Sequence, residues 1–481
     1  MNDNLAALVR AQAHHQPKHE ALELGDTVLD YAAAWRRILA LAGWLDTQGI
    51  GRGTRIAVAL PETIDHVLLH FAVAALGAVL VPIDHRATAS EQDRLAAAFG
   101  ADRIVSPCNA EGRVAIPDAL SEASLTQLAP GGDNDWLVSL SSGSTGEPKG
   151  ALVTHNQMRE RFVAQWRSLG LSGADRFALA TPLCFGAGRS FAMSTLAAGG
   201  TLILLPPPMA PEALAKALQT TAATASFLVP TLLRRLPATR GSAPLLPRLR
   251  RLIVSGEPMA ADEARQFLST ISDGLMGYYA SSEGGGISVL DSDDVAAHAD
   301  SVGRAAHGVE VEIVNEAGHT VTPGTVGQLR YRGPGVTLRT VDADGEVTEN
   351  DGWFYPGDLA SRDADGYLRL AGRSKDVIVR GGVNIYPAEI EHRIAELPAV
   401  HEVAVVGVAA PERGEAVHAF VVGDVTEADL QAHCRTHLAP YKQPEAWHRL
   451  ETLPRTKADK TDRARLRALA ETNGTDTGDR A

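Results

Sequence analysis

The segment Ser139–Gly150, "SLSSGSTGEPKG", gathers hydroxyl side chains, glycines and one lysine in a pattern that can bind phosphate. Hydroxyls and backbone N–H groups donate hydrogen bonds to phosphate oxygens, and Lys149 adds a positive charge. Glycine permits positive φ and lets the backbone approach a ligand closely. The segment fails the Walker pattern, because Pro148 precedes the lysine and Gly150 follows it. On its own, such a segment is more often a flexible connection, and a phosphate-binding loop of another kind is the alternative that the remaining motifs have to support.

The elements around this loop predict an α/β protein with largely parallel sheets. "GALVTH", directly after the loop, is typical of a strand, so the loop is not expected to open onto a helix N-terminus. Residues 27–50 have apolar side chains at helical spacing and predict a helix that stops near Gly49. Short apolar strands and helical patterns then alternate through "TRIAVAL", "ETIDHVLLHFAVAALGA", "VLVPI", "RFALAT", "TLILLPPP", "ATASFLV" and "LRRLIVSGE". Such alternation indicates parallel strands with helices between them.

The sequence pattern changes near Gly303. Short runs of alternating apolar and polar residues are separated there by turn residues, which predicts hairpins and a small β region. After Arg373 one helical pattern and two strand patterns predict a small α+β unit. We therefore expect a large domain over 1–372, a small C-terminal domain over 373–469, and a disordered polar tail over 470–481.

Composition excludes several classes of function. The chain has 481 residues and a net charge of −13, which argues against a general nucleic-acid or anionic-membrane binder. Cys108, Cys184 and Cys434 are far apart and odd in number, so neither a disulfide framework nor a zinc site is indicated, and we expect Cys184 to be a small buried residue. The polar start and the lack of a long apolar stretch predict a cytoplasmic, reducing location with no membrane partner.

Five motifs occur in a fixed order along the chain. They are "SSGSTGEPKG", "YYASSE", "GWFYPGDLA", "GRSKDVIVRGGVNIYPAEIE" and "LPRTKADKTDR". In this combination the chain resembles the AMP-forming adenylate superfamily, which includes acyl-CoA synthetases, adenylation domains of peptide synthetases and luciferases. The resemblance covers nearly the whole chain. It implies a large N-terminal domain and a small C-terminal domain that rotates on a hinge.

The resemblance assigns the phosphate and metal contacts. The loop is expected to close over the β,γ-phosphates of ATP, Ser282 to contact phosphate, and Glu283 to bind Mg²⁺, which favours hard oxygen donors. Lys460, the lysine of the last motif, is implied to stabilise the charge that develops during adenylation. The loop residues implied in phosphate binding are Ser141, Ser142, Gly143, Ser144, Thr145, Gly146 and Lys149.

The nucleoside contacts follow from the same motifs. Tyr279 is expected to stack on adenine, and Asp358 to accept hydrogen bonds from the ribose hydroxyls. Arg373 is expected to reach the ribose or the α-phosphate. "SGEP" resembles the segment whose backbone flanks adenine, which adds Ser255, Gly256 and Glu257.

The fourth motif places the hinge and the thiol path. Lys375 falls at the interdomain hinge of relatives, and Gly381 and Gly382 are expected to line the thiol tunnel. Three positions depart from the family pattern, namely Ala280, Pro356 and Asp459, where relatives have glycine, a hydroxyl residue and glycine. The last departure concerns the loop that presents Lys460.

The implied chemistry has two steps. A carboxylate attacks the α-phosphorus of Mg-ATP, which releases pyrophosphate and leaves an acyl-adenylate, and a thiol then displaces AMP. ATP, Mg²⁺ and CoA are the implied cofactors, with a phosphopantetheinyl carrier protein as the alternative acceptor. Arg380, Lys442 and Arg455 are candidates for contacts with the CoA phosphates or with an acidic carrier protein. A monomer or a homodimer is expected.

The acid is predicted to be aromatic or of medium length and apolar. "TPLCFGAGRS" lacks the aspartate with which amino-acid-activating relatives pair the substrate ammonium, and it resembles aryl-CoA ligases more closely. Arg189 is assigned either to a second carboxylate or polar ring substituent of the acid, or to a surface or structural salt bridge. The candidate pocket residues are apolar or small, with ordinary core as the alternative, and are Phe185, Gly188, Phe227, Val229, Ala280 and Gly284.

Three functions therefore stand beside one another: a CoA ligase, a stand-alone enzyme that loads a carrier protein, and a catalytically silent binding protein of the same fold. The departures at Ala280, Pro356 and Asp459 favour the silent protein. Lys149, Glu283, Asp358, Arg373 and Lys460 are all intact and favour an enzyme.

Overall fold

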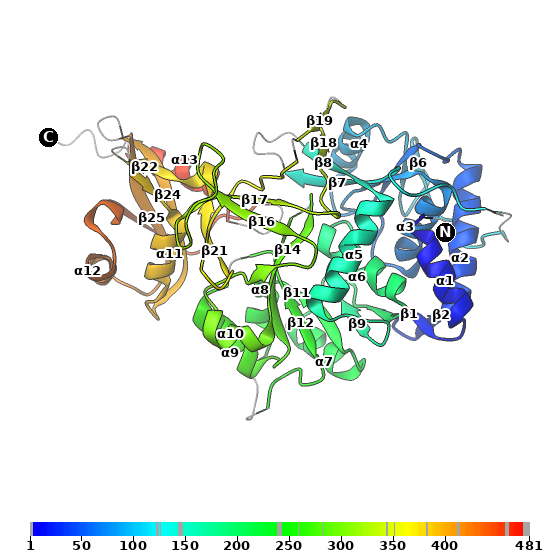
Figure 1. Cartoon of the computed structure of the whole chain (residues 1–481), viewed down its shortest axis with the longest axis horizontal. Helices are drawn as coiled ribbons and strands as arrows, with labels where there is room; N and C mark the ends of the chain where they lie inside the picture. Colours follow the sequence, from blue (N-terminus) through cyan, green and yellow to red (C-terminus); the bar gives the residue numbers. More distant parts are fainter. Residues whose placement is uncertain are drawn as a thin grey trace. The chain divides into compact units, whose positions relative to one another are not determined.

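The computed structural model describes residues 3–121, 125, 127–142, 148–237, 243–257, 259–281, 283–342, 345–350, 352–380, 383–410, 414–456 and 461–474. The chain divides into two compact units (Figure 1). Unit 1 comprises Met1–Val311 and Tyr331–Phe354, and unit 2 comprises Glu312–Arg330 and Tyr355–Ala481.

The larger sheet of unit 1 has nine strands in the order β15-β14-β13-β12-β11-β9-β10-β1-β2. Its central strands are parallel, and β2, β14 and β15 at its edges are antiparallel to their neighbours. The strands are β1 (Glu20–Leu24), β2 (Thr27–Asp30), β9 (Arg176–Leu179), β10 (Thr201–Leu204), β11 (Ala225–Leu228), β12 (Arg251–Val254), β13 (Leu275–Ser281), β14 (Gly285–Leu290) and β15 (Arg304–Ala305).

The second sheet of unit 1 has eight strands in the order β19-β18-β8-β7-β4-β3-β5-β6. Here β7 runs parallel to β4, and β8 returns antiparallel to β7. The strands are β3 (Arg55–Val58), β4 (Val79–Pro82), β5 (Arg103–Val105), β6 (Arg113–Val114), β7 (Asp135–Ser142), β8 (Pro148–Thr154), β18 (Arg339–Val341) and β19 (Val347–Glu349).

Helices between these strands supply the core of unit 1. Helix α3 is buried at every residue from His66 to Leu76, as an all-round apolar helix should be. It lies beside α1 and α2 (Figure 1). The helices of unit 1 are α1 (Ala6–His15), α2 (Tyr31–Thr47), α3 (Ile64–Leu76), α4 (Ala89–Ala98), α5 (His155–Leu169), α6 (Gly186–Ala198), α7 (Pro211–Thr220), α8 (Pro230–Arg235), α9 (Ala261–Thr270) and α10 (Ser292–His298).

The predicted α/β fold with parallel sheets is confirmed, and one element differs from its prediction. Residues 27–30 form strand β2, whereas the sequence pattern predicted a helix from there. Helix α2 begins at Tyr31, because the Asp30 side chain accepts a hydrogen bond from the backbone N–H of Ala33 and caps the helix. The predicted end near Gly49 agrees with the end of α2 at Thr47.

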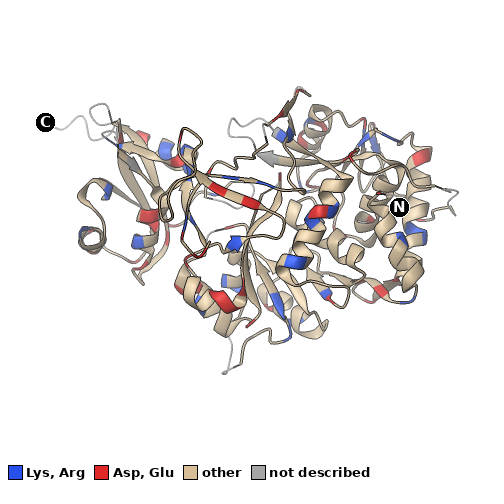
Figure 2. Cartoon of the chain, viewed as in Figure 1, with Lys and Arg blue, Asp and Glu red and all other residues tan. Residues whose placement is uncertain are grey.

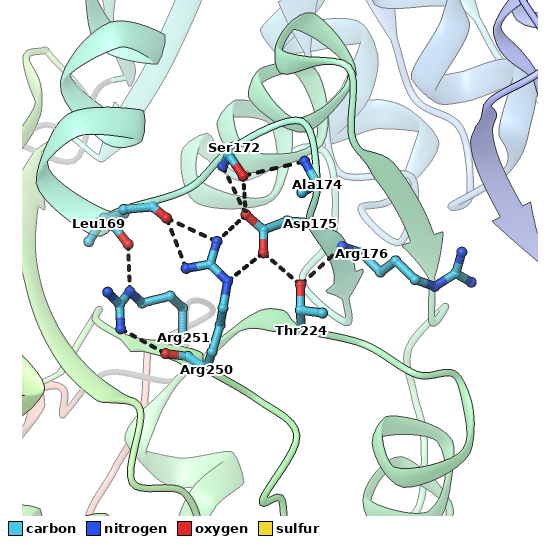
Figure 3. A network of polar contacts seen from close by, with 9 residues as sticks. Leu169, Ser172, Ala174, Asp175, Arg176, Thr224, Arg250 and Arg251 are labelled. Atoms are coloured by element: carbon cyan, nitrogen blue, oxygen red, sulfur yellow. Dashed lines mark hydrogen bonds and ion pairs between the residues drawn. The ribbon is translucent and has the colours of Figure 1, made fainter. Parts of the chain in front are cut away.

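A polar network holds the amino ends of three parallel strands together (Figure 3). The buried Asp175, just before β9, accepts hydrogen bonds from the hydroxyl of Thr224 at 2.6 Å, just before β11, and from Arg250 Nε at 2.9 Å, just before β12. Arg250 also donates to the carbonyl of Gly170 at 2.9 Å. This edge of the sheet lies opposite the carboxyl ends of the same strands, so the network is structural.

A four-stranded sheet comes next along the chain, in the order β16-β17-β20-β21, and unit 2 ends in a second sheet that contains β23-β22-β25-β24 with β26 paired to β25. The strands are β16 (Glu310–Val314), β17 (Gly327–Arg332), β20 (Asp358–Arg362), β21 (Leu368–Arg373), β22 (Ile378–Arg380), β23 (Val383–Ile385), β24 (Val400–Ala410), β25 (Gly414–Gly423) and β26 (Ala446–Arg449). The helices of unit 2 are η1 (Ser374–Asp376), α11 (Pro387–Ala395), α12 (Glu427–His437), η2 (Pro440–Lys442) and α13 (Arg463–Gly474).

The limits of unit 2 differ from the predicted domain boundary at Arg373, because residues 312–330 and 355–372 group with the C-terminal residues. A mobile domain that begins at Arg373 stays a prediction. Helix α13 continues to Gly474, five residues into the segment that we expected to be disordered. Among the helices that the structure describes, none is long and apolar enough to cross a membrane.

Candidate functional site

The phosphate-loop motif joins two neighbouring antiparallel strands. Ser141 pairs with Lys149 and Ser142 with Pro148 in the ladder between β7 and β8. Lys149 is exposed. The prediction that a strand follows the loop is confirmed, because β8 begins at Pro148. Gly143, Ser144, Thr145 and Gly146 lie outside the described residues.

The turn between β13 and β14 carries Glu283 and is fixed by several hydrogen bonds. The Glu283 carbonyl accepts from Thr337 N at 3.0 Å and from Arg161 Nη2. The hydroxyl of Ser281 accepts from Gly284 N at 3.1 Å and is hydrogen-bonded to the hydroxyl of Tyr331. Ser282 lies outside the described residues.

The Glu283 side chain suits the metal role that the motif implies. It is only partly buried, and its carboxylate has no hydrogen-bond or ion-pair partner among the residues that the structure describes. A Mg²⁺ ion that bridges phosphates needs one or two carboxylates from the protein and takes its other ligands from phosphate and water. No group of three or more possible metal ligands occurs within the described ranges. Glu283 on its fixed turn therefore fits Mg²⁺ held mainly by a nucleotide.

Tyr279 and the "SGEP" segment lie at the same edge of the nine-stranded sheet. β12 and β13 are parallel neighbours, and Ser255 follows the first while Tyr279 stands near the end of the second. Carboxyl ends of parallel strands are where α/β folds bind ligands. Gly256 is exposed and has a φ of +100°, a conformation that favours glycine. The side chain of Glu257 is already engaged, because it accepts from the Thr231 hydroxyl at 2.8 and 2.9 Å.

The acyl-pocket candidates that carry a side chain differ in how exposed they are. Phe227 is 3% exposed and packs on Phe191 with ring centroids 5.3 Å apart, whereas Phe185 at the start of α6 is 41% exposed. Val229 lies next to Gly256, since its Cγ1 is 3.5 Å from where a Cβ there would stand. Ala280 is half-buried on β13, directly after a register shift in the β13–β14 ladder.

The two glycines among these candidates allow close packing. A Cβ on Gly188 would stand 2.7 Å from the carbonyl oxygen of Thr181, and a Cβ on Gly284 would stand 2.7 Å from the hydroxyl of Tyr331. Protein therefore already fills the space beside each glycine. A contact of either glycine with an acyl group stays a prediction.

Arg189 is buried rather than paired at the surface. It is 2% exposed, and its Nη1 donates to the carbonyls of Cys184 at 3.1 Å and Leu183 at 3.3 Å. Burial lowers the pKa of Arg189 to about 10. Within the described part of the chain, Arg189 forms no ion pair. The prediction of a salt bridge for this residue is therefore wrong among the described residues. The nearby Cys184 is partly buried, and burial raises the pKa of its thiol to about 12, which argues against a nucleophile.

Sequence reasoning missed Arg161, Thr337 and Tyr331, which hold the Glu283 turn from three directions. Arg161 and Thr337 donate to the Glu283 carbonyl, and Tyr331 bonds to Ser281. Their partners are mostly backbone carbonyls, which leave no trace in the sequence.

In unit 2 the structure brings Asp358 and Arg373 together. They face each other in the β20–β21 ladder, and Arg373 Nε lies 2.7 Å from Asp358 Oδ1. Asp358 is buried and Arg373 is exposed. Lys375 is exposed in the short helix η1. Gly381, Gly382 and Lys460 lie outside the described residues.

The basic residues proposed for CoA or a carrier protein are all neutralised within unit 2. Arg380 Nη2 lies 3.0 Å from Glu445 and Lys442 Nζ lies 2.6 Å from Glu389, while Arg455 pairs with Glu402. Figure 2 shows basic and acidic residues interspersed over the described chain. These three residues therefore make no uncompensated basic patch.

Comparison with known families decides the class. A family model described as "AMP-binding enzyme" matches residues 9–339, and one described as "AMP-binding enzyme C-terminal domain" matches residues 389–460. The chain belongs to the AMP-binding enzyme family. This membership confirms the resemblance to adenylate-forming enzymes, and the CoA ligases among the relatives confirm the prediction of an acid–thiol ligase.

Individual relatives within the AMP-binding enzyme family match along their whole length. A feruloyl-CoA synthase of Amycolatopsis sp is 34% identical, and the alignment covers 97% of this chain and 99% of the relative. A long-chain-fatty-acid–CoA ligase of Mycobacterium tuberculosis is 28% identical, with 96% and 98% covered. The ATP-bound structure of MatB from Rhodopseudomonas palustris is 26% identical, with a TM-score of 0.86 over 98% of this chain and 99% of that one.

Proposed function

We propose that the protein activates an aromatic carboxylic acid with ATP and transfers the acyl group to the thiol of CoA. The observation that carries this proposal is the 34% identity to a feruloyl-CoA synthase over nearly the full length of both chains. The absence of an acidic residue from "TPLCFGAGRS" supports it, since nothing in that stretch would pair with the ammonium of an amino acid.

In the first step a carboxylate oxygen of the acid attacks the α-phosphorus of ATP, and the bond from that phosphorus to the leaving pyrophosphate breaks. The acid arrives ionised, so this step needs no general base. Glu283 would hold Mg²⁺, which neutralises phosphate charge when bound. Tyr279 and the backbone of Ser255 to Glu257 would hold adenine, and the loop from Ser141 to Lys149 would bind the leaving pyrophosphate. Lys460 would stabilise charge on the reacting phosphate.

In the second step a thiol sulfur attacks the acyl carbon, and the bond from that carbon to the AMP oxygen breaks. The thiol proton passes to solvent. Asp358, held by Arg373, would keep the ribose in place through both steps. We propose CoA as the acceptor rather than a carrier protein, because relatives that match along nearly their full length are named as CoA synthases and CoA ligases.

The test is carboxylate-dependent exchange between ATP and labelled pyrophosphate, screened over benzoates, phenylpropenoates, fatty acids and amino acids. We expect exchange with an aromatic acid and its loss in Lys460→Ala. CoA and a carrier protein that bears a free phosphopantetheine thiol are then added, in separate reactions, to the enzyme with ATP and that acid. We expect AMP release with CoA and none with the carrier protein. Exchange only with fatty or amino acids would overturn the substrate class, and AMP release only with a carrier protein would overturn the acceptor.

A further inference from the structure

A buried arginine joins the Glu283 turn to the helix that follows the phosphate loop. Arg161 stands on α5, which begins directly after β8, the strand that leaves the loop. Its side chain is 7% exposed. Nε donates to the carbonyl of Gly335 at 2.8 Å, and Nη2 donates to the carbonyl of Glu283. One edge of the guanidinium thus bridges two chain segments that lie far apart in the sequence.

A second residue, Thr337, links the same Glu283 carbonyl to strand β8. Thr337 is fully buried, and its backbone N–H donates to the Glu283 carbonyl at 3.0 Å. The Thr337 hydroxyl donates to the carbonyl of Leu152 on β8. Gln157, one turn before Arg161 on the same face of α5, donates to the carbonyl of Val336 at 3.2 Å. Residues 335–337 are therefore tied to α5, to β8 and to the Glu283 turn.

Two glycines give the arginine its room. A Cβ on Gly335 would stand 3.0 Å from Arg161 Cγ, and a Cβ on Gly285 would stand 3.3 Å from its Cγ and Cδ. The aliphatic stem of Arg161 fills these positions instead. Burial lowers the pKa of Arg161 to about 10, so the group is still charged at neutral pH. A buried charge that bonds to main-chain carbonyls is costly to disturb, which makes the link rigid.

We propose that Arg161 is a positioning residue that fixes Glu283 relative to the strand and helix leaving the phosphate loop, so that the carboxylate meets the metal of bound Mg-ATP. This inference rests on the proposed function of Glu283. Arg161 would act through the Glu283 backbone, because its bonds to this turn and to Gly335 both go to main-chain carbonyls. Lysine cannot replace it, because one ammonium group lacks the fork that spans both carbonyls.

The test measures metal binding directly, with Mn²⁺ as the probe because it also prefers oxygen ligands. The enzyme is mixed with ATP and no acid, and the dissociation constant of Mn²⁺ is taken from electron paramagnetic resonance titrations. We expect Arg161→Lys to weaken Mn²⁺ binding by about tenfold, as the loss of one charged hydrogen bond implies. Thr337→Val keeps its backbone N–H but loses the hydroxyl's bonds to the Leu152 carbonyl on β8 and to the N–H of Arg339. It should weaken Mn²⁺ binding by a smaller factor.

Arg250→Lys is the matched control. Arg250 also donates to a main-chain carbonyl, that of Gly170, but at the opposite edge of the sheet (Figure 3). The Arg250→Lys variant should have a lower melting temperature and an unchanged Mn²⁺ dissociation constant. An unchanged constant in both Arg161→Lys and Thr337→Val, alongside weakened binding in Glu283→Gln, would overturn the role of Arg161 and leave the proposed function standing. Unchanged binding in Glu283→Gln would instead overturn the metal role of Glu283.

Discussion

Gly284 shows how a single absent side chain shapes the turn that carries Glu283. A Cβ there would stand 2.7 Å from the hydroxyl and 2.9 Å from Cζ of Tyr331. That ring cannot move aside easily, because it is fully buried and packs against Phe354 with ring centroids 5.6 Å apart. We therefore expect Gly284→Ala to lower the free energy of unfolding by roughly 1–3 kcal/mol, the usual cost of overpacking. Urea titration followed by circular dichroism measures it.

Gly186→Ala is the control for that substitution. Gly186 opens helix α6, has no left-handed φ and has nothing within 4 Å of the position that a Cβ would take, so alanine should be neutral or slightly stabilising. Equal stability of Gly284→Ala and the unmodified protein would mean that Tyr331 yields at little cost. The space beside Gly284 would then be open to an acyl group after all.

The motifs predicted the charged residues expected to contact a nucleotide, but they did not predict the residues that hold those in place. Asp358 and Arg373 were both predicted, and the β20–β21 ladder places them 2.7 Å apart. Arg161 and Arg189 were harder, because each donates to backbone carbonyls, and any residue type supplies such an acceptor. A buried arginine on a helix looks the same in sequence as an exposed one.

At the scale of elements, hydrophobic pattern predicted most strands and helices of unit 1. It placed a helix over residues 27–30, where β2 pairs with β1 instead, because strand pairing, and not local pattern, decides so short a segment. Helix α3 was predicted from its apolar residues alone. The pattern did not reveal that two histidines, His66 and His70, are buried within it.

The buried histidines make α3 sensitive to acid. Burial lowers the pKa of His66 to about 4, and electrostatic interactions with His85 and Arg189 act in the same direction, while the hydrogen bond to the Pro61 carbonyl opposes them. The unfolded chain, in which this pKa is ordinary, therefore binds more protons between pH 4 and 6.5. The stabilisation of the folded state by neutral His66 is fully present above pH 6.5 and is lost as pH falls toward 4. For His66 alone we expect the free energy of unfolding to fall by about 2 kcal/mol from pH 7 to pH 5.

The measurement compares urea unfolding of the unmodified protein and of His66→Gln at those two pH values. The variant should show a smaller loss on acidification, even if it is less stable at both. His401→Gln, which changes an exposed histidine on β24, should keep the full loss. Identical pH dependence in all three proteins would show that His66 is not the group that titrates. Burial also holds the pKa of His70 well below its ordinary value, so some acid sensitivity should persist in His66→Gln.

At the scale of the whole molecule, the sequence predicted two parts from a change in strand pattern. The two family models, over 9–339 and 389–460, fall on either side of Arg373. The compact units divide the chain elsewhere, since residues 312–330 and 355–372 belong to unit 2. A sequence pattern marks where strands become short and alternating, but it does not tell which body those strands pack on. Rotation about Lys375 is accordingly still a proposal.

Lys375→Pro tests that proposal by separating the two half-reactions. A hinge works because a few residues absorb a large change in φ and ψ, and proline fixes φ near −65° and restricts the residue before it. Lys375 is exposed within η1, so a proline there should leave the folded cores intact. We expect pyrophosphate exchange to stay within about threefold and thioester formation to slow by about tenfold or more, since only the second step needs the rotated arrangement.

Lys375→Ala separates backbone freedom from side-chain chemistry at the same position. It removes the charge and keeps the backbone free, so both half-reactions should run near the unmodified rates if Lys375 acts as a hinge. Rapid-quench measurement of adenylate formation and of thioester formation gives the two rates for each variant. If alanine slowed thioester formation as much as proline, the ammonium group itself would be needed for transfer, and Lys375 would be a binding residue rather than a hinge. If proline slowed both steps equally, Lys375 would support the adenylation arrangement too, and the rotation would have to be sought at another residue.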